Sequence, residues 1–538
     1  MRLQQVTRLW LLMHCALLSF IYVSHSSPTT SPLCNKGLKS ELPYMTSNIK
    51  EVEGKSFDYI IIGGGACGCP LAATLSEKFS VLIIERGSSP YGDPTIFERT
   101  KFGFPLVETN KHTSVAQEFI SLDGVVNYRG RVLGGSTAIN SGFYSRASKE
   151  FIKKMGWDEK MVKQAYEWIE TRVVFQPEFL SPWQSVVLDG LLESGILPFN
   201  GYTLEHVEGT KLSGTIFDVF GKRHTAADLL AVGNTKNIVV LLNATVSKVF
   251  FHHEGDELRA KGVKFIQSED NTKKSYKVYL KKAEKNSTSS SEVILSAGAL
   301  SSPQILMLSG IGPSKHLKNM NISVLKNIES VGQKMQDNPA ISLLVDSKPK
   351  SRIPDTPQVT GITDQFKVIM ESIIVPISKN LTRVSIAGKL AFPKSRGKLE
   401  LKNKDPRDNP LVKFNYLSNE QDMELCVKVH QFVEHVSMSA SVSMFLRNER
   451  NRFEKMGKEE SKEYCKKNVS TFYHYHGGCI IGEVVDEEYR VYGVKGLRVM
   501  DGSTLVESPG TNPMATLMML GRYQGLKIVE ERTNMSSR

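Results

Sequence analysis

A strand, a glycine turn, a helix and a second strand near the N-terminus constrain the fold most strongly. Residues 57–62 are mostly β-branched or aromatic, as in a strand buried on both faces, and they run into a G-x-G-x-x-G pattern that begins at Gly63. A helix is expected over 70–78 and a second buried strand over 80–84, which ends at Glu85. Such glycines let the backbone approach a pyrophosphate at the helix N-terminus, and Glu85 can accept hydrogen bonds from a ribose. The unit predicts an α/β fold that binds a dinucleotide, with a ligand-free glycine turn as the alternative. The glycines of the pattern are Gly63, Gly65 and Gly68.

Length and charge narrow the class of protein. The chain has 538 residues and a mass of 60.0 kDa, which corresponds to roughly two to four ordinary domains. Hydrophobic residues make up 40% and charged residues 23%, which excludes wholesale disorder and fibrous repeats. The formal net charge is +12, but the lysines are scattered, with no arginine-rich patch among aromatics. We therefore expect no nucleic-acid partner, whereas an anionic polymer such as the cell wall would suit the basic surface.

The first 26 residues have the features of a secretory signal peptide. Arg2 and Arg8 precede the apolar run 9–23 and then small polar residues, so cleavage is expected near Ser26. A membrane anchor is the alternative, but about 15 apolar residues are short for a span that needs roughly 20. No later stretch is long and apolar enough to cross a bilayer. The sequence therefore predicts a secreted, extracellular protein without a transmembrane span.

Sequons and cysteines are consistent with the secretory route. Six Asn-x-Ser/Thr sequons predict N-glycosylation in the endoplasmic reticulum. Of seven cysteines, Cys15 lies in the signal peptide, and the other six are too few for a disulfide scaffold, although one or two bridges are allowed. Cys67 and Cys69 are too close for a C-x-x-C pair, and no metal site is expected. The sequons are Asn243, Asn286, Asn321, Asn380, Asn468 and Asn534.

The remaining chain is predicted to contain further strands, a helix pair and exposed loops. These are strands over 238–251 and 292–295, an exposed hairpin or loop over 268–291, a Pro- and Lys-rich loop over 348–357, helical spacing over 422–446, a charged stretch over 447–467, a strand and turn over 497–502, and a long helix over 513–530.

Four further segments add glycine turns and polar groups. Residues 130–140 form a second glycine-rich stretch, which lets backbone pack against a flat ligand. Residues 298–312 read as a turn, a helix and a second turn. Near the C-terminus, 473–478 (Tyr-His-Tyr-His-Gly-Gly) and 509–513 (Pro-Gly-Thr-Asn-Pro) supply polar groups.

In order and spacing these segments resemble the signatures of the glucose–methanol–choline (GMC) flavoprotein oxidoreductases. The resemblance covers about residues 55–530. Three phrases, at 68–76, 474–479 and 519–523, resemble the plant branch of that family. This branch holds HOTHEAD-type proteins and mandelonitrile lyases, and the HOTHEAD type is the closer match.

The resemblance implies a two-domain α/β fold. A Rossmann-like FAD-binding domain would be assembled from 55–150, 236–335 and 488–532. A substrate-binding domain built on an antiparallel sheet would be formed by 151–235 and 336–487. Residues 1–26 are the expected signal peptide.

The resemblance also implies FAD as the cofactor. Covalent members of the family attach the flavin to a histidine near the second glycine stretch; His112 does not match that context, so non-covalent FAD is expected. The residues expected at the cofactor are Gly63, Gly65, Gly68, Ala66 and Cys67 at the diphosphate, Glu85 and Arg86 at the ribose, Val246 at the adenine, Val132, Ser136, Asn140, Ser141, Gly142 and Phe143 on the flavin side, Asp501 and Gly502 at the pyrophosphate and ribityl region, Pro513 and Met514 near the flavin ring, and also Tyr473.

His474 and Asn512 are the expected catalytic pair, by alignment with the family's motifs. Histidine titrates near neutrality, so a neutral imidazole can accept the hydroxyl proton while a hydride leaves the carbon. The Asn512 amide would donate to the substrate oxygen as negative charge develops. His476 is the alternative base, because it lies two residues away. A second alternative is that both histidines are hydrogen-bonded core residues.

The expected reaction is oxidation of an alcohol to an aldehyde, and the HOTHEAD resemblance implies long-chain ω-hydroxy fatty acids as substrates. Mandelonitrile lyase is the first alternative, although lyases of this branch carry a histidine where this chain has Asn512. The second alternative is a weakly active flavoprotein of the cell wall. We expect a monomer, and the electron acceptor stays open.

The chain departs from the branch pattern at several positions. Met514 stands where glutamine is usual, and a thioether cannot replace the amide's hydrogen bonds, although it can pack on an apolar edge. Residues 337–397 are shorter and richer in lysine than the pattern, in a part of the chain that bears on specificity.

The resemblance suggests a bridge between Cys426 and Cys465, with reduced thiols as the alternative, whereas Cys479 is expected as a small buried residue.

Overall fold

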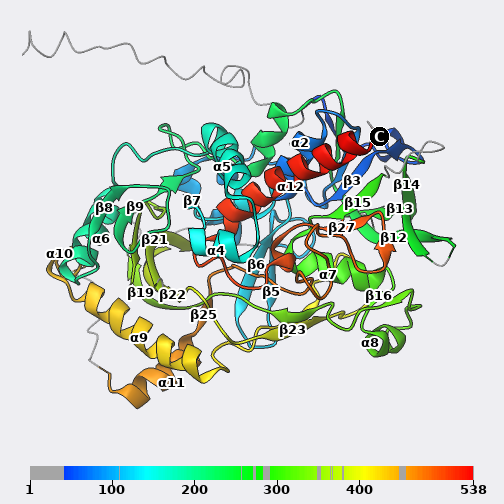
Figure 1. Ribbon diagram of the computed structural model, residues 1–538. Coiled ribbons are helices and arrows are strands. Elements are labelled where there is room, and N and C mark those ends of the chain that lie inside the picture. Colours follow the sequence, from blue (N-terminus) through cyan, green and yellow to red (C-terminus); the bar gives the residue numbers. More distant parts are fainter. Residues whose placement is uncertain are drawn as a thin grey trace, which may run out of the picture. The chain divides into compact units, whose positions relative to one another are not determined.

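The computed structural model describes the chain from residue 42 onwards, with short gaps (Figure 1). The expected signal peptide therefore lies outside the described residues, as do the sequons Asn286 and Asn380. Within the described residues no helix has the length and apolar character needed to span a membrane. The residues left out are 1–41, 108, 256, 271–273, 283–290, 348–352, 364, 366, 379–380, 447–455 and 537–538.

A six-stranded parallel sheet forms the first layer. Its strands are short and almost wholly buried, because each is an apolar run covered on both faces. Helix α2 (Gly68–Leu75) follows the first long strand and packs against the C-terminal helix α12 (Pro513–Ser536), which also contacts α5 (Glu159–Val173) (Figure 1). The strand order is β1 (Met45–Thr46), β11 (Ile238–Leu241), β4 (Val81–Ile84), β3 (Tyr59–Ile62), β15 (Glu292–Leu295) and β27 (Leu497–Val499).

A second sheet and helix α7 (Gly298–Leu308) cover the opposite face of the parallel sheet and share one apolar core with it. Its strands are β12 (Ala244–Glu254), β13 (Glu257–Gln267), β14 (Ser275–Leu280) and β2 (Ser56–Phe57), with β26 (Val494–Lys495) paired to β13.

A seven-stranded, mostly antiparallel sheet forms the other part of the molecule. Helices α6 (Pro182–Glu193) and α9 (Glu420–Ser437) pack on it, and α10 (Ala440–Phe445) and α11 (Lys458–Asn468) lie against them (Figure 1). The strand order is β25 (Ser470–Thr471), β19 (Pro339–Ser347), β22 (Leu381–Leu390), β21 (Val368–Ser378), β20 (Val359–Ile362), β9 (Gly209–Leu212) and β8 (Phe199–Tyr202).

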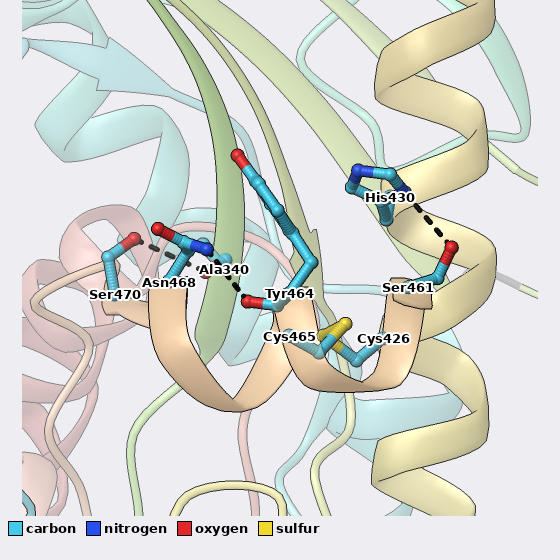
Figure 2. The surroundings of a disulfide bond; sticks show 8 residues. All are labelled: Ala340, Cys426, His430, Ser461, Tyr464, Cys465, Asn468 and Ser470. Carbon is cyan, nitrogen blue, oxygen red and sulfur yellow. Dashed lines mark hydrogen bonds between the residues drawn. A yellow bond between two sulfur atoms is a disulfide. The ribbon is translucent and has the colours of Figure 1, made fainter. Parts of the chain in front are cut away.

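A disulfide joins Cys426 on α9 to Cys465 on α11, which confirms the expected bridge (Figure 2). The same two helices approach each other at His430, whose ring lies 4.5 Å from that of Tyr464. Cys479 is a buried free thiol, as expected.

The remaining elements are short. They are α3 (Pro94–Phe97), α4 (Lys149–Lys154), α8 (Ser314–Asn319), β5 (Ala116–Ile120), β6 (Val126–Gly130), β7 (Phe143–Tyr144), β10 (Gly214–Thr215), β16 (Ile311–Gly312), β17 (Lys326–Asn327), β18 (Gln333–Met335), β23 (Gly397–Glu400) and β24 (Leu411–Lys413).

Several predicted elements are interrupted in the structure. The first strand is divided at Asp58, because β2 before it pairs with β14 of the second sheet and β3 after it pairs within the parallel sheet. The Asp58 carboxylate accepts hydrogen bonds from the backbone N–H and hydroxyl of Ser80 at this point. The strand over 238–251 is two strands, which meet at Asn243 with a left-handed φ of 54°. The helix over 422–446 is also two, because the Ser439 hydroxyl caps a new helix by accepting from the Val442 N–H. By contrast, the hairpin expected as one alternative within 268–291 is confirmed, because strand β14 there pairs antiparallel with β13.

The two large sheets draw on different parts of the chain. The parallel sheet takes strands from 55–150, 236–335 and 488–532, and also β1, which precedes them. The seven-stranded sheet takes its strands from 151–235 and 336–487, although α5 packs on α12 instead. We propose that these sheets are the cores of the expected FAD-binding and substrate-binding domains.

Candidate active site

One large cavity, of about 1190 Å³, contains most of the expected site. It runs from the glycine turns of the parallel sheet to β19, β21 and β22 of the seven-stranded sheet. All the expected site residues line it except Gly68, Val132 and Gly142. Those that do are Gly63, Gly65, Ala66, Cys67, Glu85, Arg86, Ser136, Asn140, Ser141, Phe143, Val246, Tyr473, His474, Asp501, Gly502, Asn512, Pro513 and Met514.

Two glycines of the first turn have different surroundings: one packs against backbone and the other faces the cavity. A Cβ on Gly68 would lie 2.1 Å from the Gly63 carbonyl oxygen, so this glycine permits close contact between α2 and β3. A Cβ on Gly65 would meet only the Gly135 Cα, at 3.9 Å, and would otherwise project into the cavity. The turn therefore leaves room at the N-terminus of α2 for a flat, phosphate-bearing ligand.

Glu85 and Arg86 shape the neighbouring wall. Both Glu85 carboxylate oxygens accept backbone hydrogen bonds, from Gly64 N–H at 3.0 Å and Gly87 N–H at 2.9 Å. Burial raises the pKa of Glu85, and these bonds oppose that shift. Arg86 donates to the Gln117 side chain and the Gly130 carbonyl. Glu85 keeps acceptor capacity for a ribose hydroxyl, because each carboxylate oxygen has a second lone pair.

The Asp501 carboxylate accepts its hydrogen bonds from groups of the protein itself. Its carboxylate accepts from Gly298 N–H at 2.9 Å, Ser302 Oγ at 2.5 Å and Ser503 N–H at 2.8 Å. It thereby joins the turn after β15 to the turn after β27, which places the Gly502 backbone on the cavity. We expect its contribution at the cofactor to come from this turn.

Arg129 is a cavity-lining residue that sequence reasoning missed. Its Nη1 donates to Ser301 Oγ at 2.8 Å and its Nε to Gln117 at 3.2 Å. Its Nη2 is buried and has no hydrogen-bond partner among the described residues. Because an orphaned donor beside Arg86 suits an anionic, acceptor-rich ligand, the cavity fits a dinucleotide. The only signal in the sequence was its position just before the second glycine stretch.

The flavin-side segment is held by Asn140. Its Oδ1 accepts from Gly142 N–H and from Arg223, and its Nδ2 lies 3.0 Å from Met514 Sδ. Met514 thus receives an amide hydrogen bond through sulfur as well as packing in the core. Val132 is buried in a small apolar cluster. Gly142 has a φ of 76°, and a Cβ there would lie 2.6 Å from the Phe217 ring.

The backbone at His474 is fixed by a buried carboxylate. Asp337 accepts from the His474 N–H at 2.7 Å, from Thr471 Oγ1 at 2.5 Å and from the Tyr416 hydroxyl at 2.7 Å. Burial raises the pKa of Asp337 to about 6. Tyr473, in a left-handed conformation, makes the turn that presents the next residue to the cavity.

Two groups approach Nδ1 of the His474 ring, the Asn338 amide oxygen and, at 3.3 Å, the Lys389 ammonium. Nδ1 lies 3.2 Å from Asn338 Oδ1, and the Asn338 amide nitrogen donates to the carbonyls of Leu390 and Ala391. The oxygen of Asn338 therefore faces the ring, and in the tautomer that keeps a lone pair on Nε2 it accepts from Nδ1–H. Burial, then the charges of Lys389 and His476, hold the pKa of His474 well below its usual range. His474 is therefore neutral at neutral pH and can accept a proton.

Asn512 lies between two buried charges that the sequence analysis did not predict. Its Oδ1 accepts from Lys389 Nζ at 2.7 Å, and its Nδ2 donates to Glu371 Oε2 at 3.3 Å. Lys389 on β22 is fully buried and Glu371 on β21 nearly so. Burial lowers the pKa of Lys389 and raises that of Glu371, and each charge opposes the other's shift. A charged residue inside an apolar strand was the available signal.

The alternative base, His476, lies off the cavity. Its Nδ1 is 2.9 Å from the His474 carbonyl oxygen, its ring is buried, and it does not line the cavity. Burial lowers its pKa to about 4. The geometry therefore favours His474 over His476.

The wall opposite the glycine turns is largely apolar. Side chains of β19 and β21 line it together with Arg383 and with Tyr464 and Asn468 of α11. Among the residues that the structure describes, no cluster of His, Cys, Asp or Glu has the make-up of a metal site. The apolar residues of the two strands are Leu343, Leu344, Ile373, Val375 and Ile377.

Comparison with known proteins identifies one family. Models of the GMC oxidoreductase family match residues 57–340 and 393–521. The Arabidopsis thaliana protein HOTHEAD is 42% identical over 89% of this chain and 89% of its own length. An (R)-mandelonitrile lyase-like protein of Arabidopsis thaliana is 42% identical over 88% of this chain and 90% of its own. A sinalpyl alcohol oxidase of Nesocodon mauritianus is 40% identical over 89% of both chains.

Solved structures agree on the fold. A formate oxidase of Aspergillus oryzae superposes with a TM-score of 0.75 over 90% of this chain and 100% of that chain, at 18% identity. A similarity at this level of identity concerns the fold alone.

Proposed function

The chain belongs to the GMC oxidoreductase family, and from that premise we propose that it is an FAD-dependent enzyme that oxidises an alcohol CH–OH group to an aldehyde. One observation carries the proposal. A neutral, buried His474 and the amide of Asn512 line the same cavity as the glycine turn that leaves room for a dinucleotide.

His474 and Asn512 would act on the substrate oxygen. Nε2 of His474 accepts the hydroxyl proton in the tautomer whose Nδ1–H donates to Asn338. The Asn512 amide donates to the same oxygen as negative charge develops, which a group fixed in advance does most effectively. FAD, when bound, supplies the acceptor for the hydride. The apolar side chains of β19 and β21 lower the polarity of the neighbouring part of the cavity.

FAD would be bound without a covalent bond. The residues proposed to hold it are the expected ones that line the cavity, with Arg129 added. Gly68, Val132 and Gly142 would support them from behind. His112, the nearest candidate for covalent attachment, is exposed and does not line the cavity.

Long-chain ω-hydroxy fatty acids are the proposed substrates. The apolar side chains of β19 and β21 support an extended aliphatic chain. An aromatic alcohol is the competing substrate, because the sinalpyl alcohol oxidase is 40% identical to this chain.

Lys389 favours hydroxynitrile lyase as a second candidate function. Asn512 itself carries no charge, but the Lys389 ammonium lies 2.7 Å behind its oxygen and puts positive charge at the same end of the cavity. Such a charge would stabilise a departing cyanide. The (R)-mandelonitrile lyase-like relative supports testing this reaction. A weakly active flavoprotein of the cell wall is the outcome if neither reaction occurs.

We propose secretion and N-glycosylation on the strength of the N-terminal segment and the sequons. Asn321, Asn468 and Asn534 are exposed, whereas Asn243 is partly buried in a left-handed turn. Glycans are therefore expected at the exposed positions first. The monomeric state and an association with the cell wall through the net charge of +12 are part of the same proposal.

The anaerobic absorption spectrum of the purified holoprotein tests the function. Bleaching of the visible flavin band by an ω-hydroxy fatty acid or by benzyl alcohol is the expected result, and the faster substrate identifies the class. Release of benzaldehyde and cyanide from mandelonitrile without bleaching would establish the lyase instead. A bound flavin that responds to none of these compounds would contradict both functions.

A further inference from the structure

Lys389 is a buried lysine whose position the proposed oxidation does not by itself explain. It is fully buried, and its ammonium lies 2.7 Å from Asn512 Oδ1 and 3.3 Å from His474 Nδ1. Its Nζ also faces the Phe472 ring, 5.1 Å from the centroid. It does not line the cavity, so it acts behind the two residues that do.

Fold stability is a poor reason for a lysine in this position. Taking an ammonium out of water costs more than one imperfect pairing returns, and apolar replacements of buried ion pairs are often neutral or stabilising. The neighbours on β22 show that an apolar residue would fit the strand, since Ile386, Ala387 and Leu390 are buried there. The contacts with Asn512 and His474 suggest a role in the site instead.

We infer that Lys389 is a positioning residue of the reaction centre, which holds the Asn512 amide with its nitrogen towards the substrate and keeps His474 uncharged. The inference rests on the proposed alcohol oxidation, because it assigns to Lys389 a role in the two groups that handle the substrate oxygen.

The orientation of Asn512 follows from the hydrogen-bonding capacity of its neighbours. An ammonium has donors only, so Lys389 selects the amide oxygen. The Glu371 carboxylate, when ionised, has acceptors only, so it selects the amide nitrogen from the other side. The second N–H of Asn512 is then free for a ligand in the cavity. The ammonium also polarises the amide, which makes that N–H a stronger donor.

The charge state of His474 follows from the groups around it. Lys389 opposes an imidazolium at 3.3 Å. Its ammonium can donate only to a lone pair on Nδ1, whereas Asn338 Oδ1 can accept only from Nδ1–H, so Asn338 holds the hydrogen in the tautomer that leaves Nε2 free for the substrate. The titratable and charged groups facing His474 are Lys389 on β22, His476 on its own segment, Asp337 before β19, and Glu371 on β21 through Asn512, with Lys211 and His206 behind them. Asp337 and Glu371 favour the imidazolium, whereas Lys389 and His476 oppose it.

Two substitutions separate orientation from charge. Lys389→Met removes both the donor and the charge while keeping a similar aliphatic stem. Lys389→Gln removes the charge but keeps an N–H that can donate to Asn512. Lys211→Met is the matched control: this second buried lysine donates to Ser145 Oγ and to the carbonyls of Thr203 and Glu205.

The first measurement is the pKa of His474 in the holoprotein, by NMR of 13C-labelled histidine, with the signal assigned by its loss in His474→Asn. It needs no substrate, so it stands even if the proposed oxidation is wrong. We expect the His474 pKa to rise by about 1 in both Lys389→Met and Lys389→Gln, because a like charge at this distance has been removed. In Lys211→Met it should stay within a few tenths of the wild-type value.

The second measurement is kcat/KM for the best alcohol as a function of pH. Lys389→Met should lower the plateau roughly 10–100-fold through the misplaced Asn512 donor, with Lys389→Gln recovering most of that loss. In both variants the acid limb should move to higher pH, following the His474 pKa.

Three outcomes would overturn the inference. The first is an unchanged His474 pKa in both Lys389 variants. The second is a change of the His474 pKa in Lys211→Met as large as in those variants. The third is a kcat/KM plateau in Lys389→Met equal to that of the wild type. A lower flavin absorbance or a lower melting temperature in both Lys389 variants would assign Lys389 a structural role instead. A wild-type enzyme that oxidises no alcohol contradicts the proposed function, and the NMR result then decides the charge effect alone.

Discussion

The two ends of the cavity are built in different ways. The end proposed to bind FAD, the cofactor end, consists of glycine turns, at 63–68, 130–135 and 298, where the backbone itself approaches the ligand space. The opposite end, proposed as the catalytic end, consists of side chains from β21, β22 and the C-terminal turns, with an ammonium and a carboxylate on either side of Asn512. At the first end, function depends on the lack of a side chain; at the second, it depends on side chains that meet only in the fold.

The largest effect is expected at the catalytic end. His474→Asn removes the proposed base, and a positioned base contributes roughly 10²–10⁴-fold, so kcat/KM should fall by that factor. Rapid-reaction flavin reduction is the measurement, with flavin content as the check that the cofactor end is intact. His476→Asn is the matched control, because that ring is off the cavity. Full turnover in His474→Asn, or an equal loss in the control, would remove the distinction between the two histidines.

At the cofactor end, neighbouring glycines should respond in opposite ways. Gly68→Ala places a methyl 2.1 Å from the Gly63 carbonyl, and such overpacking costs about 1–3 kcal/mol or more of the free energy of unfolding. Gly65→Ala meets no protein atom nearer than 3.9 Å, so the melting temperature of the apoprotein should hold while the affinity for FAD falls.

Thermal unfolding of the apoproteins and flavin titration test this pair. A Gly65→Ala protein that binds FAD like the wild type would show that the open space at this turn is not the cofactor site. An unchanged melting temperature in Gly68→Ala would contradict the packing role.

The disulfide should stabilise the fold at the catalytic end and leave the affinity for FAD at the cofactor end unchanged. The double substitution Cys426→Ser and Cys465→Ser opens a bridge between residues 39 apart, which typically costs about 2–4 kcal/mol. Differential scanning calorimetry should show a lower melting temperature, while FAD affinity stays at the wild-type value. Reductant added to the wild type should reproduce the shift, and a loss of FAD from the double variant would indicate that the two ends are coupled.

The smallest expected effect is a flat pH profile on the acid side. The pKa of His474 is lowered in the fold, so the imidazole stays unprotonated, and active as a base, at every pH above that lowered value. Activity is lost only as the pH falls through it. For an alcohol without titratable groups, kcat/KM should therefore change less than about twofold between pH 8 and the ordinary histidine value of about 6.5. A decrease of kcat/KM to half of its plateau value near pH 6.5 would show that His474 is exposed to solvent.

Sequence reasoning predicted the elements around the first glycine turn well, because they are local. The strand at 59–62, the turn and helix α2 follow one another, so their spacing carries the geometry. The interruptions at Asp58, Asn243 and Ser439 were missed, because each depends on a hydrogen bond or a backbone angle that apolar patterning does not encode. The disulfide was anticipated through the family resemblance.

The catalytic end was predicted only at the residues that belong to motifs. His474 and Asn512 stand in recognisable phrases, whereas Lys389 and Glu371 stand in strands that look like ordinary core segments. Their pairing depends on the antiparallel register of β21 and β22, which aligns Ile369 with Lys389 and Glu371 with Ala387. Arg129 was missed for a similar reason, since its orphaned Nη2 is visible only when the cavity is formed.

By itself, the sequence determined the parallel α/β layer, the dinucleotide turn and the family, because glycine spacing and buried strands are local physical constraints. The tertiary structure decided which histidine lines the cavity, which way the Asn512 amide points and which charges surround it. Those properties are set by burial and by contacts between residues more than a hundred positions apart, and no local pattern records them.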